Sequence, residues 1–349
     1  MGRKRGPMLA FLQYAFLQHS AGGAFAPASA HHETLVHSHR HRTLVAALPL
    51  SSPMKAGSLV ALVTPMTPDG ALDLDSLREL LQWHVRSETD GIVALGTTGE
   101  ASTLSMEERA AVLQVCSEEV VGKVPLMVGT GTIDPRKVIA MNEQALEYGA
   151  DSCLVVTPYY TKPTQAGLLR FFRYVADATS LPLLLYNVPG RTAVDLQPHT
   201  VGELAKHPRI FGIKEATGDL ARVPLLRELC GDDFMLFSGE DSNALEFTLH
   251  GGDGVISVTS NVAPAEQHLV FEAALRGDEV AAQEHNEQLK LLHQRLFLQA
   301  NPIPVKWALA AAGRVPYGIR LPLCELEEPF HTPLLEAMRV AGVAVCAGL

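Results

Sequence analysis

The stretch Ile210-Phe211-Gly212-Ile213-Lys214-Glu215-Ala216 is apolar at its start and carries a lysine and a glutamate near its end. Its length and its apolar beginning predict a buried strand. Burial disfavours the charged form of a lysine, lowers its pKa and makes the amine nucleophilic enough to form a Schiff base with a carbonyl compound. The alternative is a core lysine neutralised by its neighbour Glu215, and this stretch alone does not separate the two interpretations.

Seven further runs are built in the same way, because each is short and apolar and is separated from the next by a longer amphipathic segment. They are Ser58–Thr64, Gly91–Thr97, Leu126–Gly131, Cys153–Tyr160, Pro182–Pro189, Phe234–Glu240 and Gly254–Asn261. Helical periodicity marks the intervening segments Leu74–Val85, Ser105–Val121 and Pro135–Tyr148, and Ser105 stands three residues before Glu108, as in a capping box. Eight strand–helix units over about 200 residues predict a (β/α)8 TIM barrel of the α/β class.

The eight runs end in residues that can take part in chemistry. They are Thr64, Thr97, Thr98, Thr130, Tyr159, Tyr160, Tyr186, Asn187, Lys214, Ser238, Glu240, Ser257 and Thr259. A barrel enzyme has its active site at the C-terminal ends of its strands, so these side chains are expected to converge on Lys214. A doubly wound sheet is the competing architecture, but Gly96-Thr97-Thr98-Gly99-Glu100 is neither a GxGxxG nor a Walker phosphate loop.

Helical segments continue beyond the eighth unit, at Ala265–Gln299, Val305–Ala312 and Pro333–Val343. They are too long for the closing helix of a barrel alone, so the sequence predicts a C-terminal helical appendage, of a kind that often mediates assembly. The predicted organisation is a leader at 1–57, a catalytic barrel at 58–280 and a C-terminal helical region at 281–349.

Residues 1–57 differ in composition from the rest, with six Lys or Arg, one acid and six histidines, which gives +5 and leaves −15 for the remaining residues. We interpret them as a disordered leader. A plastid or mitochondrial transit peptide has this basic character, but an extension upstream of a bacterial start at Met54 is the preferred interpretation. The histidines at 31, 32, 37, 39 and 41 could bind metal, although a disordered tract that contains histidines is the simpler explanation.

Overall composition narrows the class of protein. The chain is 47% hydrophobic over 349 residues, which is enough to bury a large core. Its net charge of −10 and the absence of a run of about 18 apolar residues argue against nucleic acid and membranes as main partners. Five scattered cysteines without a CxxC spacing indicate free thiols in a reducing compartment, so a cytoplasmic location is predicted, with the plastid as the alternative.

Five motifs together resemble the 4-hydroxy-tetrahydrodipicolinate synthase (dihydrodipicolinate synthase) family. They are Gly96–Glu100 (GTTGE), Tyr159-Tyr160, Tyr186–Thr192 (YNVPGRT), Gly212–Gly218 (GIKEATG) and Asn301–Lys306 (NPIPVK). The resemblance is colinear from about Gly57 to Val343 and specific, because the motifs occur in order and at the predicted strand ends. The wider superfamily includes N-acetylneuraminate lyase and keto-deoxy-sugar-acid aldolases, which use a barrel lysine with pyruvate.

The resemblance implies a reaction in which Lys214 forms an imine with pyruvate, and the derived enamine adds to L-aspartate 4-semialdehyde. Tyr186 would move protons at the imine, with Thr97 and Tyr160 as its relay. No further cofactor and no metal are implied, because the covalent imine on Lys214 takes that place. In this family Tyr160 is donated across a subunit interface, so the resemblance also implies a homotetramer, a dimer of dimers.

The resemblance also assigns the binding of the two carboxylates. Thr98, at a glycine-rich turn, would hold the pyruvate carboxylate, and Arg191 would bind that of the semialdehyde as a bidentate fork. The amide of Gly239 and the carbonyl of Ile256 line the pocket in relatives. A pyruvate-dependent aldolase or lyase acting on a sugar acid is the alternative function. It is less favoured because Arg191 suits a short carboxylate substrate, and because Thr98 belongs to a Thr-Thr pair where neuraminate lyases usually carry serine.

Feedback by L-lysine, the end product of the pathway, is predicted to be weak or absent. In lysine-sensitive relatives the effector binds beside the helices after the second and third strands, where a glutamate accepts its ammonium groups. The matching positions here are Met106, Arg109, Ile133 and Lys137, while Tyr159 is kept. The glutamate has therefore become a cation, which repels the effector.

Overall fold

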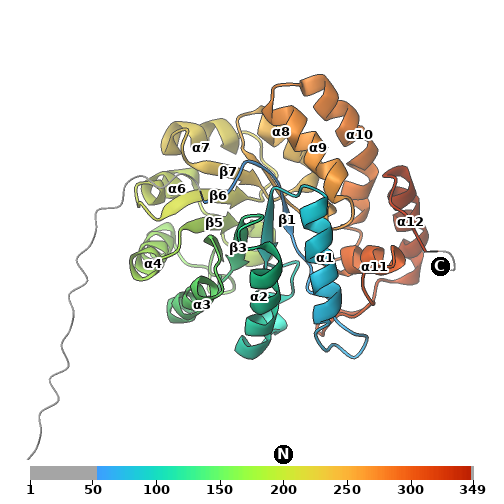
Figure 1. Cartoon of the computed structure of the whole chain (residues 1–349). Helices are drawn as coiled ribbons and strands as arrows, with labels where there is room; N and C mark the ends of the chain where they lie inside the picture. The colour runs from blue at the N-terminus through green and yellow to red at the C-terminus, as the bar shows by residue number, and fades with distance from the viewer. Residues whose placement is uncertain (1–52, 347–349) are drawn as a thin grey trace, which may run out of the picture. The chain divides into compact units, whose positions relative to one another are not determined.

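The computed structural model describes residues 53–346. Eight parallel strands close into a barrel in which each strand pairs with the next and β8 pairs with β1 (Figure 1). The strands are β1 (Gly57–Ala61), β2 (Gly91–Ala94), β3 (Leu126–Gly129), β4 (Ser152–Val156), β5 (Leu183–Asn187), β6 (Ile210–Glu215), β7 (Met235–Ser238) and β8 (Gly254–Ser257). The predicted TIM barrel is confirmed.

Most strands end two to four residues before the predicted runs do. The predicted run Cys153–Tyr160, for example, corresponds to β4 at Ser152–Val156, and Tyr160 adopts a positive φ of 68° in the loop that follows. The predicted runs were too long because polar and aromatic residues at the mouth of a barrel continue the strand composition after the backbone has left the sheet.

Helices surround the barrel and are drawn as its outer ring in Figure 1. They are α1 (Leu74–Arg86), α2 (Met106–Val120), α3 (Pro135–Glu147), α4 (Gln165–Ala178), α6 (Pro198–Ala205), α7 (Arg222–Cys230), α8 (Ala244–Leu249) and α9 (Pro264–Leu275). The one-turn helix α5 (Pro189–Thr192) instead follows β5 directly, and its residues Arg191 and Thr192 line the cavity described below. The predicted capping box of α2 is present, since Ser105 accepts from the Glu108 amide and the Glu108 carboxylate accepts from the Ser105 amide. Such a box satisfies two backbone donors that a helix start otherwise leaves free.

The core of the described residues has three parts. One lies between the strands and the surrounding helices, a second joins α9 to residues 282–341, and an inner layer fills the barrel interior with side chains such as Leu59, Met127, Phe237 and Ile256. Met54 is 3% exposed and belongs to this inner layer. The packed chain therefore begins before the predicted boundary at residue 57, because an apolar side chain there covers the interior of the barrel. The remaining predicted leader, residues 1–52 with its histidine cluster, lies outside the described residues, and both interpretations of it stay predictions.

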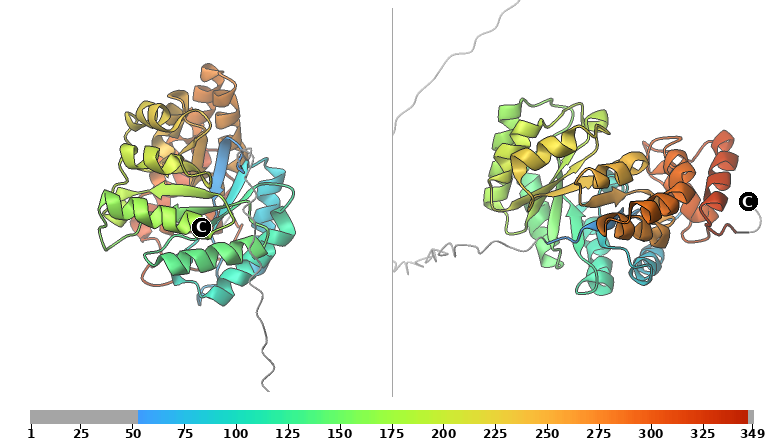
Figure 2. Two further views of the ribbon diagram at one scale, coloured as in Figure 1. Left: turned by 90° about the vertical axis from the view of Figure 1, so that its left-hand side faces the viewer. Right: turned by 90° about the horizontal axis from the view of Figure 1, so that it is seen from above.

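Three more helices, α10 (Glu279–Arg295), α11 (Ile303–Ala311) and α12 (His331–Val340), form the C-terminal region beside α1 and α9 (Figures 1 and 2). The prediction of one helical segment over Ala265–Gln299 is wrong. The segment breaks between α9 and α10 at Gly277, whose φ of 78° favours glycine, and Asp278 then caps α10 by accepting from the Ala281 amide. Because α10 starts at Glu279, the predicted boundary after residue 280 falls inside this helix.

No helix among residues 53–346 is both long and apolar enough to cross a membrane. All five cysteines lie in that range and are free thiols.

Candidate active site

Lys214 and Tyr186 meet at the C-terminal mouth of the barrel. They occupy paired positions on β6 and β5, and the Lys214 Nζ lies 4.7 Å from the centre of the Tyr186 ring. Both side chains are buried, at 6% and 7% exposure. Successive side chains of a strand point to opposite faces, so alternate residues of β6, including Lys214, point into the barrel.

Glu215 points to the other face of β6 and does not neutralise Lys214. Its carboxylate accepts from Arg222 Nε at 3.0 Å, from Asn187 Nδ2 at 3.2 Å and from the Thr217 amide at 2.9 Å. Among residues 53–346 no carboxylate forms an ion pair with Lys214. The interpretation of Lys214 as a core lysine paired with its sequence neighbour is therefore wrong, because neighbours along a strand face opposite ways.

The pKa of Lys214 is lowered to about 8, mainly by burial and in part by the nearby Arg191 guanidinium, while Asp241 and Glu240 act in the opposite direction. An amine with this pKa has a substantial uncharged fraction near neutral pH, which is the form that attacks a carbonyl carbon. The mouth of the barrel thus holds an amine that is able to act as a nucleophile.

The Tyr186 phenol stays protonated at neutral pH. Burial raises its pKa, whereas Arg191 and a hydrogen bond with the Thr97 side chain act to lower it. Thr97 and Tyr186 line the same cavity, but Tyr160 does not, and its side chain is 88% exposed. A single chain therefore brings two of the three predicted relay groups together and leaves the third outside.

Thr98 and Arg191, the two predicted carboxylate-binding residues, are joined by Asn301. Asn301 Nδ2 donates to Thr98 Oγ1 at 3.0 Å, and Arg191 Nη2 donates to the Asn301 carbonyl at 3.3 Å. The Asn301 side chain is 6% exposed. Sequence reasoning gave Asn301 no role, although it opens the NPIPVK motif that contributed to the family resemblance.

Gly239 and Ile256 lie where the sequence places them, at or near the ends of β7 and β8. Ile256 is buried in the barrel interior. The Gly239 amide already donates to the Glu215 carbonyl at 2.7 Å, so in this structure it is engaged in the sheet. What Gly239 provides is space, because a Cβ there would lie 2.9 Å from Lys214 Cε and 2.6 Å from Ala216 Cβ.

Gly239→Ala is expected to displace the Lys214 side chain and reduce kcat, by about a hundredfold for a shift of about 1 Å, with the fold retained. Steady-state kinetics together with circular dichroism would measure this. The control is Gly167→Ala on α4, where the added methyl meets neighbours at an ordinary 3.5 Å. Equal kcat values for the two variants would contradict the role assigned to Gly239.

The loop that carries Thr97 and Thr98 is fastened by a buried ion pair that the sequence analysis missed. Glu100 pairs with Lys306 of α11, and its second oxygen accepts from the Arg320 amide at 3.1 Å. Lys306 is fully buried at 0% exposure, and Glu100 at 4% holds a positive φ of 52°. Asn301 and Lys306 show that the C-terminal region forms part of the support of the site.

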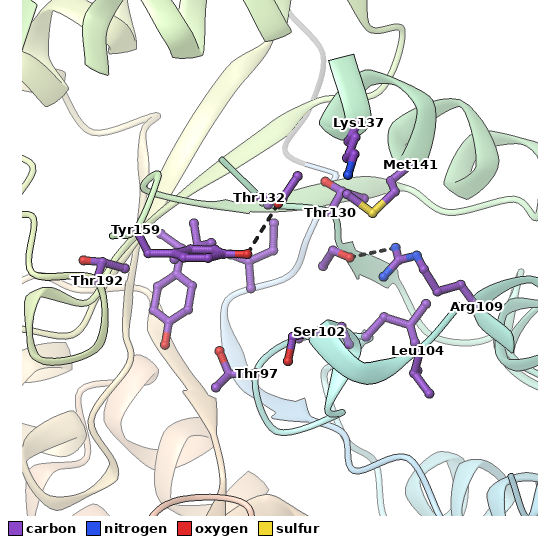
Figure 3. Close-up of a pocket in the computed structure, with 18 of the residues that line it drawn as sticks. Thr97, Ser102, Leu104, Arg109, Thr130, Thr132, Lys137, Met141, Tyr159 and Thr192 are labelled. Carbon is purple, nitrogen blue, oxygen red and sulfur yellow. Dashed lines mark hydrogen bonds between the residues drawn. The ribbon is translucent and has the colours of Figure 1, made fainter. Parts of the chain in front are cut away.

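A cavity of about 720 Å³ opens beside these residues. Thr97, Tyr186 and Arg191 line one end of it. The other end lies between α2 and α3, where Figure 3 shows Arg109, Lys137 and Met141 close together and Tyr159 turned toward Thr132. Within residues 53–346 no group of three or more His, Cys, Asp or Glu residues is arranged to hold a metal ion.

A family model, similar sequences and similar solved structures all point to the same family. The sequence model of the Dihydrodipicolinate synthetase family matches residues 54–340. The 4-hydroxy-tetrahydrodipicolinate synthases of Thioalkalivibrio sulfidiphilus and Pseudomonas aeruginosa are 52% and 51% identical, each over 83% of this chain and 99% of the relative. The structure of chloride-inhibited dihydrodipicolinate synthase from Acinetobacter baumannii, complexed with pyruvate, is 47% identical with a TM-score of 0.81, over 83% of this chain and 99% of that one.

Proposed function

This chain belongs to the dihydrodipicolinate synthetase family, and from that premise we propose that it condenses pyruvate with L-aspartate 4-semialdehyde to give 4-hydroxy-tetrahydrodipicolinate. The enzyme is a lyase of the route to diaminopimelate and lysine. The observation that carries the proposal is the buried Lys214, with a pKa lowered to about 8, beside the Tyr186 phenol at the mouth of a barrel.

The proposed reaction begins with attack of the uncharged Lys214 amine on the keto carbon of pyruvate. Loss of water gives an imine, and loss of a proton from the methyl carbon gives an enamine. The enamine carbon then bonds to the aldehyde carbon of the semialdehyde, whose oxygen takes up a proton. Finally the amine of the semialdehyde attacks the imine carbon, closes the ring and releases Lys214.

Tyr186 is the proposed proton donor and acceptor. Its phenol lies beside Lys214 and is protonated, so it can give a proton to the leaving oxygen when the imine forms and take one back later. Thr97 contacts this phenol within the chain, and we propose that Tyr160 of a neighbouring subunit completes the relay. No cofactor other than Lys214 is needed in this scheme.

Thr98 and Arg191 are the proposed holders of the two substrate carboxylates, at positions fixed by their shared partner Asn301. The sugar-acid aldolase or lyase is not favoured, because the relatives are named as synthases. The test is an assay with pyruvate and aspartate semialdehyde in parallel with one for pyruvate release from N-acetylneuraminate or a keto-deoxy-sugar acid. Turnover only in the second assay would overturn the assignment.

We further propose a homotetramer built as a dimer of dimers, located in the cytoplasm. The exposed Tyr160 supports a shared active site, and the five free thiols support a reducing compartment.

Mixing Tyr160→Phe chains with Lys214→Ala chains is expected to restore activity that neither variant has. Hybrid dimers assemble one intact site from a wild-type Lys214 and a partner's wild-type Tyr160, so recovery of up to about a quarter of wild-type turnover follows from random exchange. Activity is measured after subunit exchange has been verified by mass spectrometry. Absence of recovery would indicate self-contained sites.

L-Lysine is expected to inhibit this enzyme weakly or not at all. Arg109 and Lys137 line the matching end of the cavity, and no Asp or Glu is among the lining residues described. Loss of a charge-assisted bond lowers affinity by about tenfold to a hundredfold, before repulsion is counted. Initial rates over lysine concentrations at saturating semialdehyde would test this, and half-inhibition below about 1 mM would contradict it.

A further inference from the structure

The end of the cavity between α2 and α3 has an unusual charge for this protein. The residues that line the whole cavity include Arg109, Lys137 and Arg191 but no Asp or Glu, although the chain carries a net charge of −10. Arg191 belongs to the catalytic end. Arg109 and Lys137 lie at the other end, where the proposed reaction leaves them without a task (Figure 3).

Arg109 is a buried guanidinium without an acidic partner. It is 3% exposed, and its Nη2 donates to the Gly129 carbonyl at 2.9 Å, while Nε has no hydrogen-bond partner. Burial lowers its pKa to about 10, and within residues 53–346 no carboxylate forms an ion pair with it. Buried charges in proteins are nearly always paired, because an uncompensated one costs several kcal/mol.

Lys137 presents a second unpaired cation. Its ammonium group makes no hydrogen bond or ion pair with residues 53–346, and Figure 3 shows it directed from α3 toward the same space as Arg109. The neighbouring Arg136 behaves differently, since it pairs with Asp134 at 3.1 Å and lies outside the cavity. Two cations that face one space without a counterion favour a ligand with two negative charges.

The other residues at this end of the cavity indicate what kind of ligand would fit between Arg109 and Lys137. The hydroxyl-bearing residues Ser102, Thr130, Thr132 and Tyr159 line it, and so do the apolar residues Leu104, Met106, Ala140 and Met141. Pockets for small organic ligands combine an apolar wall with a few polar groups that fix orientation. An inorganic ion would leave the apolar wall without a contact.

We propose that Arg109 and Lys137 form a second anion site, separate from the catalytic end, that binds a short-chain dicarboxylate. Arg109 provides a guanidinium already oriented by Gly129, which suits a carboxylate, and Lys137 provides a mobile point charge for the second carboxylate. The site depends on the cavity and its charges and not on the reaction proposed above.

The test is isothermal titration calorimetry of the full-length enzyme with succinate at low ionic strength, which measures the affinity and the number of sites. Binding is expected at one site per chain, to persist in Arg191→Met, and to weaken by about tenfold to a hundredfold in Lys137→Gln. Arg136→Gln is the matched control, because it removes the same charge from the preceding position, which is exposed like Lys137 but does not line the cavity, and it should leave the affinity unchanged. Arg109→Met should abolish binding, and Arg109→Lys should restore part of it if the Met variant folds poorly.

Four results would overturn the proposal. One is the absence of succinate binding up to about 10 mM, weaker than ordinary specific affinities. Another is loss of binding in Arg191→Met with no change in Lys137→Gln, which would place the ligand at the catalytic end. The third is inorganic phosphate binding as tightly as succinate, because the apolar wall would then contribute nothing. Weakening by Arg136→Gln equal to that by Lys137→Gln would likewise show only a general charge effect.

Discussion

Lys214→Ala is expected to abolish both turnover and trapping of pyruvate by borohydride. Loss of the nucleophile should lower kcat by at least about 10⁴-fold, since no other described lysine lies at the mouth beside Tyr186. In the wild-type enzyme, borohydride with pyruvate should add one pyruvate-derived mass to the peptide that contains Lys214. Mass spectrometry of the digested protein measures this directly.

Trapping should also report the lowered pKa of Lys214. Because only the uncharged amine attacks, the rate of imine formation should rise with pH up to about 8 and then level off. With a lysine of the ordinary pKa of 10.5, the rate would continue to rise above pH 8. Lys290→Ala on the exposed face of α10 serves as the control and should trap normally. Modification of a different lysine, or a rate that still climbs above pH 9, would refute the assignment.

Lys306→Ala is expected to destabilise the protein by about 3–5 kcal/mol, because it leaves the buried Glu100 carboxylate without its cation. The loop that holds Thr97 and Thr98 should also loosen, so kcat should fall together with stability. Denaturant unfolding at a fixed protein concentration measures the first effect, since subunit association contributes to apparent stability.

Two comparisons isolate this effect. Lys290→Ala breaks an exposed pair with Glu287 and should leave stability almost unchanged. The double variant Lys306→Met with Glu100→Gln removes both charges and should recover much of the stability lost in Lys306→Ala, without recovering full activity. A loss below about 1 kcal/mol in Lys306→Ala would mean that Glu100 finds another partner.

The barrel could be predicted from the sequence because its signal is local. Each strand is a short apolar run, and each helix carries its own periodicity and, at Ser105, its own cap. Helix breaks depend on single residues, so Gly277 was overlooked inside a long helical pattern. Strand ends were placed too late because composition does not change where the hydrogen bonding of the sheet stops.

The pair Lys214 and Tyr186 could be predicted because consecutive strands of a barrel are neighbours, which places their ends side by side. Asn301 and Lys306 could not, because their partners Thr98 and Glu100 stand 203 and 206 positions away in the chain. The five motifs together hold two lysines, Lys214 and Lys306, and two glutamates, Glu100 and Glu215. The sequence does not show which lysine pairs with which glutamate. The alternative in which Glu215 neutralises Lys214 fails for the same reason, since proximity in sequence is not proximity in space.

The support of the GTTGE loop by Lys306 and Arg320 also bears on how the protein is made. During synthesis a nascent chain could close all eight strands once β8 has left the ribosome, yet Glu100 would still lack both partners, which stand 206 and 220 positions further on. Thr98 would likewise lack its hydrogen-bond partner Asn301. The barrel can thus exist as a fold before its catalytic loop is set, and the translated polypeptide acquires a competent active site only when almost its entire length has emerged.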